Sequence, residues 1–119
     1  LDVFFVTLNK ADKDYSPTTM YNDYSISESL FHWQSQSTTA ENSPTGQRYI
    51  HHRERGSKVL LFVREFKSDR MTGGAEAYTY LGTASYVKHE GSRPMNITWK
   101  LDRPIPAKFL KKTNKLAVG

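Results

Sequence analysis

Side chains that can hydrogen-bond to nucleotide bases gather in two neighbouring parts of the sequence. Residues 30–36 alternate like a strand, which places His32, Gln34 and Gln36 on one face, and the polar loop 37–47 follows. Amide, imidazole and guanidinium groups can read base edges, and a guanidinium also pairs with phosphate. The residues expected to contact nucleic acid here are His32, Gln34, Gln36, Thr45, Arg48, Tyr49 and Arg53. In the alternative interpretation, these amides are buried in a barrel and satisfy backbone groups.

Aromatic side chains form a second candidate site. Three tyrosines share one face of the alternating stretch 78–88. Rings on a surface can stack on bases or enclose a flipped or modified base. The possible pocket consists of Trp33, Tyr78, Tyr80 and Tyr86. The alternative is ordinary packing in the core or at a sheet edge.

Positive charge is concentrated towards the C-terminus. The chain has 17 Lys and Arg against 12 Asp and Glu, a net charge of +5, and residues 100–119 carry all of this excess. A helix over 106–117 would align four lysines in one stripe, namely Lys108, Lys111, Lys112 and Lys115. Concentrated positive charge indicates a polyanionic partner, and we expect duplex DNA. A solvated lysine-rich surface is the alternative.

The sequence offers few groups for catalysis. The chain has no cysteine, which excludes thiol catalysis and Cys-ligated metals. His51 and His52 are adjacent and point in different directions, and no metal-site spacing or Gly-rich phosphate loop is present. The carboxylates of Glu65 and Glu90, with Lys88, lack a spacing specific to nucleases, so a degenerate nuclease is only a third interpretation. We expect a non-enzymatic domain with no cofactor and no metal.

The candidate residues lie mostly on predicted strands or beside them. Apolar runs predict strands at 3–8, 30–36, 58–65, 78–88 and 95–101. Of these, 3–8 is expected to be buried, and 58–65 is expected to be buried on both faces through its middle. Ser43 and Pro44 predict a short helix near 44–54, and Pro106 predicts a C-terminal helix near 106–117. The expected fold class is α+β, with mostly antiparallel strands in a strongly bent sheet or small β-barrel. Alternation predicts a core of Phe5, Phe31 or Trp33, Leu60, Phe62, Leu81, Ile97 and Trp99.

The length of 119 residues favours a single domain spanning 1–119. Because a strand begins almost at the first residue, we expect this domain to be part of a larger protein. No apolar run has the length of a membrane span and no signal peptide is visible. We therefore expect a cytoplasmic domain that does not contact a membrane.

Several sequence blocks together resemble a bacterial family. They are Phe31–Gln36, Ser43–Tyr49, Val59–Val63, Tyr78–Gly82, Trp99–Leu101 and Ile105–Pro106. In this order they are similar to the family called domain of unknown function 3427, from about Phe5 to Ala117. The resemblance implies a position at the C-terminus of superfamily 2 helicase proteins, often with a phospholipase-D-type nuclease domain, in restriction or defence systems. It supplies no catalytic residues.

Two functions follow from these observations. The first is a DNA-binding module that reads a sequence or a modified base for the attached motor or nuclease. The second is an intramolecular docking module that regulates the helicase without contacting nucleic acid. A docking face should be apolar at its centre, whereas a reader should combine positive charge with a polar groove.

Overall fold

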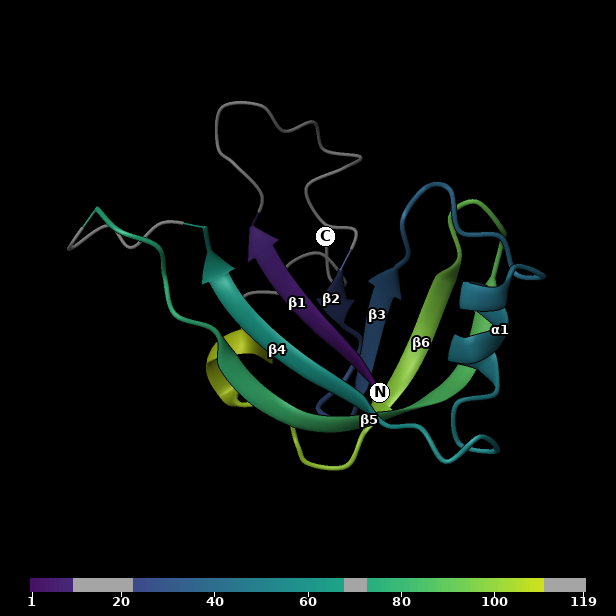
Figure 1. The fold of residues 1–119 in the computed structure, drawn as a ribbon. Coiled ribbons are helices and arrows are strands. Elements are labelled where there is room, and N and C mark those ends of the chain that lie inside the picture. The colour runs from purple at the N-terminus through teal and green to yellow at the C-terminus, as the bar shows by residue number, and fades with distance from the viewer. Residues whose placement is uncertain (10–22, 68–72, 111–119) are drawn as a thin grey trace.

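A computed structural model describes residues 1–9, 23–67 and 73–110 of the chain. Six strands form one curled sheet, a half-barrel, in the order β1-β4-β5-β6-β3-β2 (Figure 1). The strands are β1 (Asp2–Asn9), β2 (Tyr24–Ser25), β3 (Leu30–Gln34), β4 (Val59–Phe66), β5 (Thr79–Glu90) and β6 (Asn96–Leu101), and the helix α1 is Pro44–Ile50. Neighbouring strands are antiparallel except for β1 and β4, which are parallel. The predicted α+β class with a strongly bent, mostly antiparallel sheet is confirmed.

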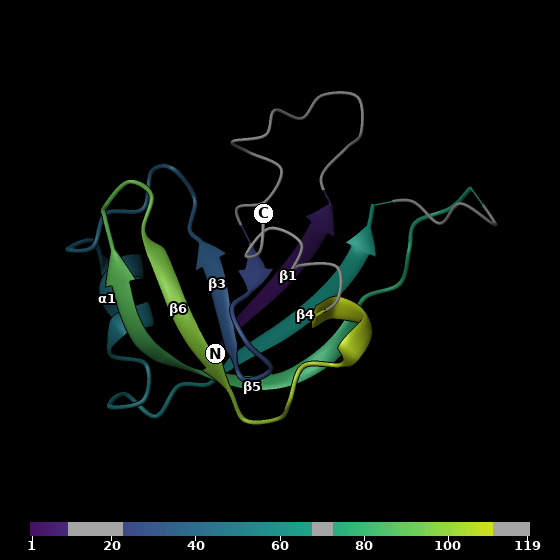
Figure 2. The same ribbon diagram turned by 180° about the vertical axis from the view of Figure 1, so that it is seen from behind.

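Strand β5 bends the sheet. Its first half, up to Ala84, pairs with β4, and its second half, from Ala84 on, pairs with β6 (Figure 2). The register shifts within both pairings, and Gly82 near the first shift has a φ of +103°, which L side chains rarely adopt. Strand β5 thus connects the part of the sheet that contains β1 and β4 to the part that contains β6, β3 and β2.

One cluster of buried side chains defines the inner side of the sheet. It contains Phe4, Val6, Leu8, Phe31, Val59, Leu61, Val63, Leu81, Ala84, Met95, Ile97, Trp99, Leu101, Ile105 and Phe109. The core prediction is confirmed for Phe31, Leu81, Ile97 and Trp99.

For β1 and β4 the core prediction is wrong, because it assigned the buried face to the wrong set of alternate residues. Phe5 is 61% exposed, and Leu60 and Phe62 are only partly buried, because the alternate residues of both strands face inwards. Neither strand is buried on both faces. Both are continuous apolar runs, so their sequences contain no alternation that could fix which face is buried.

The helices begin where the sequence predicts. The Ser43 hydroxyl accepts a hydrogen bond from the Gly46 amide at 3.1 Å, and Pro44 occupies the first turn. The helix α1 ends at Ile50, earlier than the predicted 54. At the C-terminus, residues 107–110 form one helical turn that buries Phe109, and the rest of the predicted helix, 111–117, lies outside the described residues. No helix in the described ranges is both long and apolar enough to cross a membrane.

Candidate nucleic-acid interface

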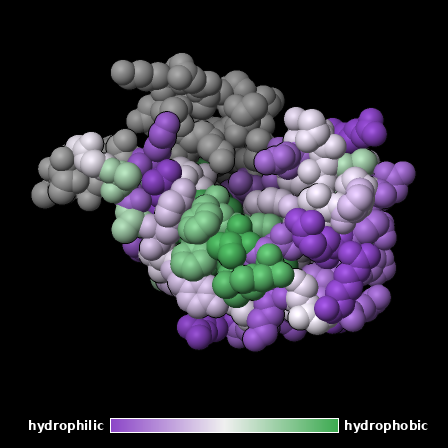
Figure 3. Space-filling model, in the orientation of Figure 1, coloured by the Kyte–Doolittle hydropathy of each residue, from purple (hydrophilic) through white to green (hydrophobic). Residues whose placement is uncertain are grey.

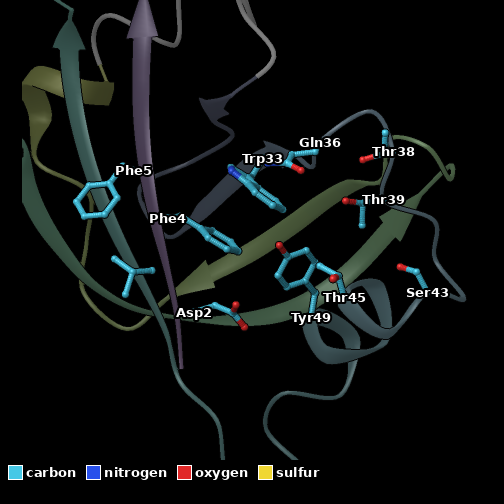
Figure 4. Close-up of a pocket in the computed structure, with 11 residues that line it drawn as sticks. Asp2, Phe4, Phe5, Trp33, Gln36, Thr38, Thr39, Ser43, Thr45 and Tyr49 are labelled. Atoms are coloured by element: carbon cyan, nitrogen blue, oxygen red, sulfur yellow. The ribbon is translucent and has the colours of Figure 1, made fainter.

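A cleft of about 460 Å³ lies between the edge strand β1, strand β3, the start of α1 and the loop that joins β3 to α1 (Figure 4). Its volume is in the range of ligand-binding clefts. The lining residues are Asp2, Val3, Phe4, Phe5, Trp33, Gln36, Thr38, Thr39, Ser43, Thr45 and Tyr49. The cleft therefore combines segments that are distant in the sequence.

Three aromatic rings form one wall of this cleft. Phe4 and Trp33 stack in parallel, with ring centroids 4.0 Å apart and an interplanar angle of 7°. Tyr49 meets both rings edge-on, at 5.5 and 5.4 Å. Phe4 is buried, whereas Trp33 and Tyr49 are only partly buried. A planar ligand can thus reach aromatic surface that neighbouring rings hold in a fixed orientation.

Polar side chains surround these rings. The side chains of Gln36, Thr38 and Thr45 make no hydrogen bond to any described residue and line the cleft beside Trp33 and Tyr49. They offer an amide and two hydroxyls, which can both donate and accept hydrogen bonds. A planar ring with polar edges, such as a nucleobase, has the chemistry that this arrangement fits.

Arg48 is bound within the fold. Its Nη2 and Nε atoms donate to the Asp2 carboxylate at 2.9 and 3.0 Å, which joins α1 to the start of β1. The hydrogen bond to Asp2 raises the pKa of Arg48, although burial opposes the shift. Burial, and then the Asp2 charge, raises the pKa of Tyr49, so its hydroxyl stays protonated near neutral pH.

His32 and Gln34 lie away from this cleft. They face the outer side of β3, where His32 stacks on Tyr24 with centroids 4.6 Å apart. The Gln34 amide donates to the Asn96 side chain at 3.2 Å. Strand pairing ends at Gln34, so Gln36 no longer follows the alternation and instead enters the cleft. The structure brings together Gln36, Thr45 and Tyr49 from the predicted groove and separates them from His32 and Gln34.

The four residues of the predicted aromatic pocket lie in three places. Trp33 lines the cleft, Tyr78 and Tyr80 lie on the outer side near Phe5 and Phe62, and Tyr86 packs near Trp99. They do not form one pocket.

The predicted cationic residues lie elsewhere. Arg53 is exposed and lines a separate open hollow beside Tyr86, and Lys108 lies over the ring of Phe109 with its Nζ 4.9 Å from the centroid. Lys111, Lys112 and Lys115 lie outside the described residues.

Sequence reasoning missed one array of titratable groups. His89 lies between the Tyr86 hydroxyl and the Glu41 carboxylate, with each nitrogen 2.7 Å from its partner oxygen. Burial, and then the Glu41 charge, raises the pKa of Tyr86, which disfavours a nucleophilic phenolate. The array ties the loop that lines the cleft to β5. No sequence signal marks it, because Glu41 is 48 residues from His89.

These features define an α+β half-barrel with an aromatic, polar-edged cleft, and no group of three metal-ligating side chains occurs in the part of the chain that the structure describes. Residues 2–112 match the family described as domain of unknown function (DUF3427), and the chain belongs to this family. The expected family is thus confirmed. No curated protein matches the chain.

Proposed function

We propose that this domain is a non-catalytic DNA-binding module that recognises a base, defined by sequence or by modification, in the cleft between β1, β3 and α1. The observation that carries the proposal is the combination of the partly exposed Trp33 and Tyr49 rings with three polar side chains that make no hydrogen bond to any described residue. Proteins that read a single base use the same combination: the base stacks on an aromatic side chain, and polar side chains hydrogen-bond to the edge of the base.

The charge distribution supports a polyanionic partner. The net charge of +5 comes from residues 100–119, while the remainder of the chain is balanced. Lysines that contact phosphates supply affinity without sequence information, and groups on base edges supply specificity. In this proposal the domain serves helicase or nuclease domains of the same polypeptide, in the cytoplasm of a bacterium and in a restriction or defence system, as the family resemblance implies.

Binding to a panel of short duplexes, unmodified and with modified cytosines or adenines, tests the proposal. We expect one duplex to bind more tightly than the others. The double variant Gln36→Ala/Thr45→Val should weaken binding to that duplex by about 5- to 150-fold, as loss of base contacts of about 1–3 kcal/mol implies. It should leave binding to the other duplexes nearly unchanged.

The matched control is Asn42→Ala, because Asn42 is exposed in the same loop but does not line the cleft. Absence of duplex binding at low salt, or an unchanged preference in the double variant, would contradict recognition in the cleft.

A further inference from the structure

Four adjoining aromatic rings lie on the outer side of the sheet, on β1, on β4 and at the start of β5. We name them the outer aromatic face: Phe5, Phe62, Tyr80 and Tyr78, which directly precedes β5. The ring centroids of Phe5 and Phe62 are 5.1 Å apart, and those of Phe62 and Tyr80 are 4.9 Å apart. Tyr78 meets Phe5 edge-on at 5.1 Å. The rings thus form a continuous row across three strands.

This row is open to solvent. Phe5 is 61% exposed and Tyr80 is 42% exposed, although both are large hydrophobic side chains. The space-filling view shows a continuous hydrophobic patch over β1 and β4, in the centre of this face of the molecule (Figure 3). A contiguous exposed patch of this kind marks an interaction site more often than isolated surface hydrophobics do.

Cations accompany the rings. Arg64 lies on the same side of β4 as Phe62, and Lys58, the residue before β4, lines a hollow with Thr83 and Ser85 on the neighbouring strand β5. Lys58 and Arg64 are six residues apart, about 20 Å along an extended strand. Arg64 lies with its Cζ 4.4 Å from the Tyr78 ring centroid and donates to the Thr7 hydroxyl at 2.9 Å.

No carboxylate interrupts this surface on the two strands that form its centre. The outward positions described are Val3, Phe5 and Thr7 on β1, and Leu60, Phe62, Arg64 and Phe66 on β4. A surface with rings in the middle and positive charge at both ends is complementary to a chain with stackable bases and a negative backbone.

We propose that the outer aromatic face binds single-stranded DNA, whose bases stack on Phe5, Phe62 and Tyr80 while Lys58 and Arg64 contact phosphates. This inference rests on the proposed function only in that the partner is DNA. It concerns a different surface and a different form of DNA. Unpaired bases expose the flat surfaces that stacking requires, whereas a duplex hides them.

Fluorescence anisotropy with a labelled oligothymidylate of about 12 nucleotides tests the inference. Tyr80 is the residue to change, because Phe5 also borders the cleft. Tyr80→Leu keeps an apolar side chain but removes the ring, and we expect it to weaken binding by about 5- to 100-fold. Tyr80→Phe keeps the ring and should bind within about twofold of the wild type. Phe62→Leu is the second variant and should weaken binding likewise.

Val87→Ala is the matched control, since Val87 is 47% exposed on the same strand and outside the aromatic row. Circular dichroism confirms that each variant is folded. Two results would overturn the inference: a wild type that does not bind oligothymidylate, or a folded Tyr80→Leu protein that binds it like the wild type. Self-association in sedimentation that a folded Tyr80→Lys protein loses, without oligothymidylate binding by the wild type, would identify the face as an apolar protein-docking surface instead.

The two proposals fail separately. The cleft variant Gln36→Ala/Thr45→Val should leave oligothymidylate affinity unchanged, because neither residue lies on the outer aromatic face. If duplex preference is absent while oligothymidylate binding still depends on Tyr80, recognition in the cleft is wrong and this inference stands.

Discussion

The guanidinium of Arg48 binds a residue of the fold. Its Nε and Nη2 atoms both donate hydrogen bonds to the Asp2 carboxylate. We expect Arg48→Ala to lower the free energy of unfolding by about 1 kcal/mol, because the pair is bidentate but Arg48 is substantially exposed. Arg48→Lys should be more stable than Arg48→Ala but less stable than the wild type, since an ammonium cannot form the two parallel hydrogen bonds. Urea denaturation measures the difference.

The control for that prediction is Arg53→Ala, at an exposed arginine five residues after Arg48 and beyond the end of α1. It should change stability by less than about 0.5 kcal/mol. Unchanged stability of Arg48→Ala, together with a lost duplex preference, would assign Arg48 to DNA contact instead.

Tyr49 and Tyr86 make the fold sensitive to high pH. The pKa of each is raised by burial in the native state, so the native protein holds the phenol proton more tightly than the unfolded chain does. This stabilisation is complete below the unfolded pKa of about 10 and is lost as the pH rises through the native pKa. Tyr49→Phe and Tyr86→Phe should therefore lose less stability than the wild type between about pH 8 and about pH 11.

Denaturation at the two pH values measures this effect. Tyr80→Phe is the control, because Tyr80 is exposed, and it should lose as much stability as the wild type. An identical loss in all four proteins would show that other groups cause the alkaline destabilisation.

At the scale of the elements, the approach of α1 to the preceding loop depends on Gly46. A Cβ at this position would lie 2.2 Å from the backbone oxygen of Ala40. Gly46→Ala should thus displace α1 and destabilise the protein by about 1–3 kcal/mol, with a lower melting temperature. Asn42→Ala, in the same loop, should melt within about 1–2 °C of the wild type. A Gly46→Ala protein that melts like the wild type would show that the loop moves aside freely.

Elements with a clear local signal were predictable, and the pairings between them were not. Strand β3 alternates and α1 has a capping serine, so the inward position of Phe31 and the start of the helix follow from the sequence. Strands β1 and β4 have apolar residues on both sides, and their orientation depends on how the sheet curls.

The same distinction applies to the candidate site. Gln36, Thr45 and Tyr49 come from a polar stretch that could be recognised, whereas Phe4 and Asp2 reach the cleft from β1. The Asp2–Arg48 contact joins residues 46 positions apart, and no local pattern indicates it.

At the scale of the whole molecule, the lysines near the C-terminus should set the salt dependence of DNA binding. They carry the excess charge of a chain that is otherwise balanced, and each phosphate contact contributes about −0.9 to the slope of log affinity against log salt. Lys111→Ala/Lys112→Ala should flatten this slope by roughly two units. Titrations at several salt concentrations measure it, and an unchanged slope with intact affinity would assign both lysines to a solvated surface.

The parallel pairing of β1 with β4 governs the order in which the protein can fold. Asp2 pairs with Val59, and β2, β3 and α1 all lie between them in the sequence. Closing such a long loop costs entropy before any contact compensates it, whereas the β4–β5 and β5–β6 pairs close shorter loops. We therefore expect β1 to join the sheet after β4, β5 and β6 have paired. Since β1 supplies Phe4 and Asp2, we expect the cleft to form only when β1 has joined the sheet.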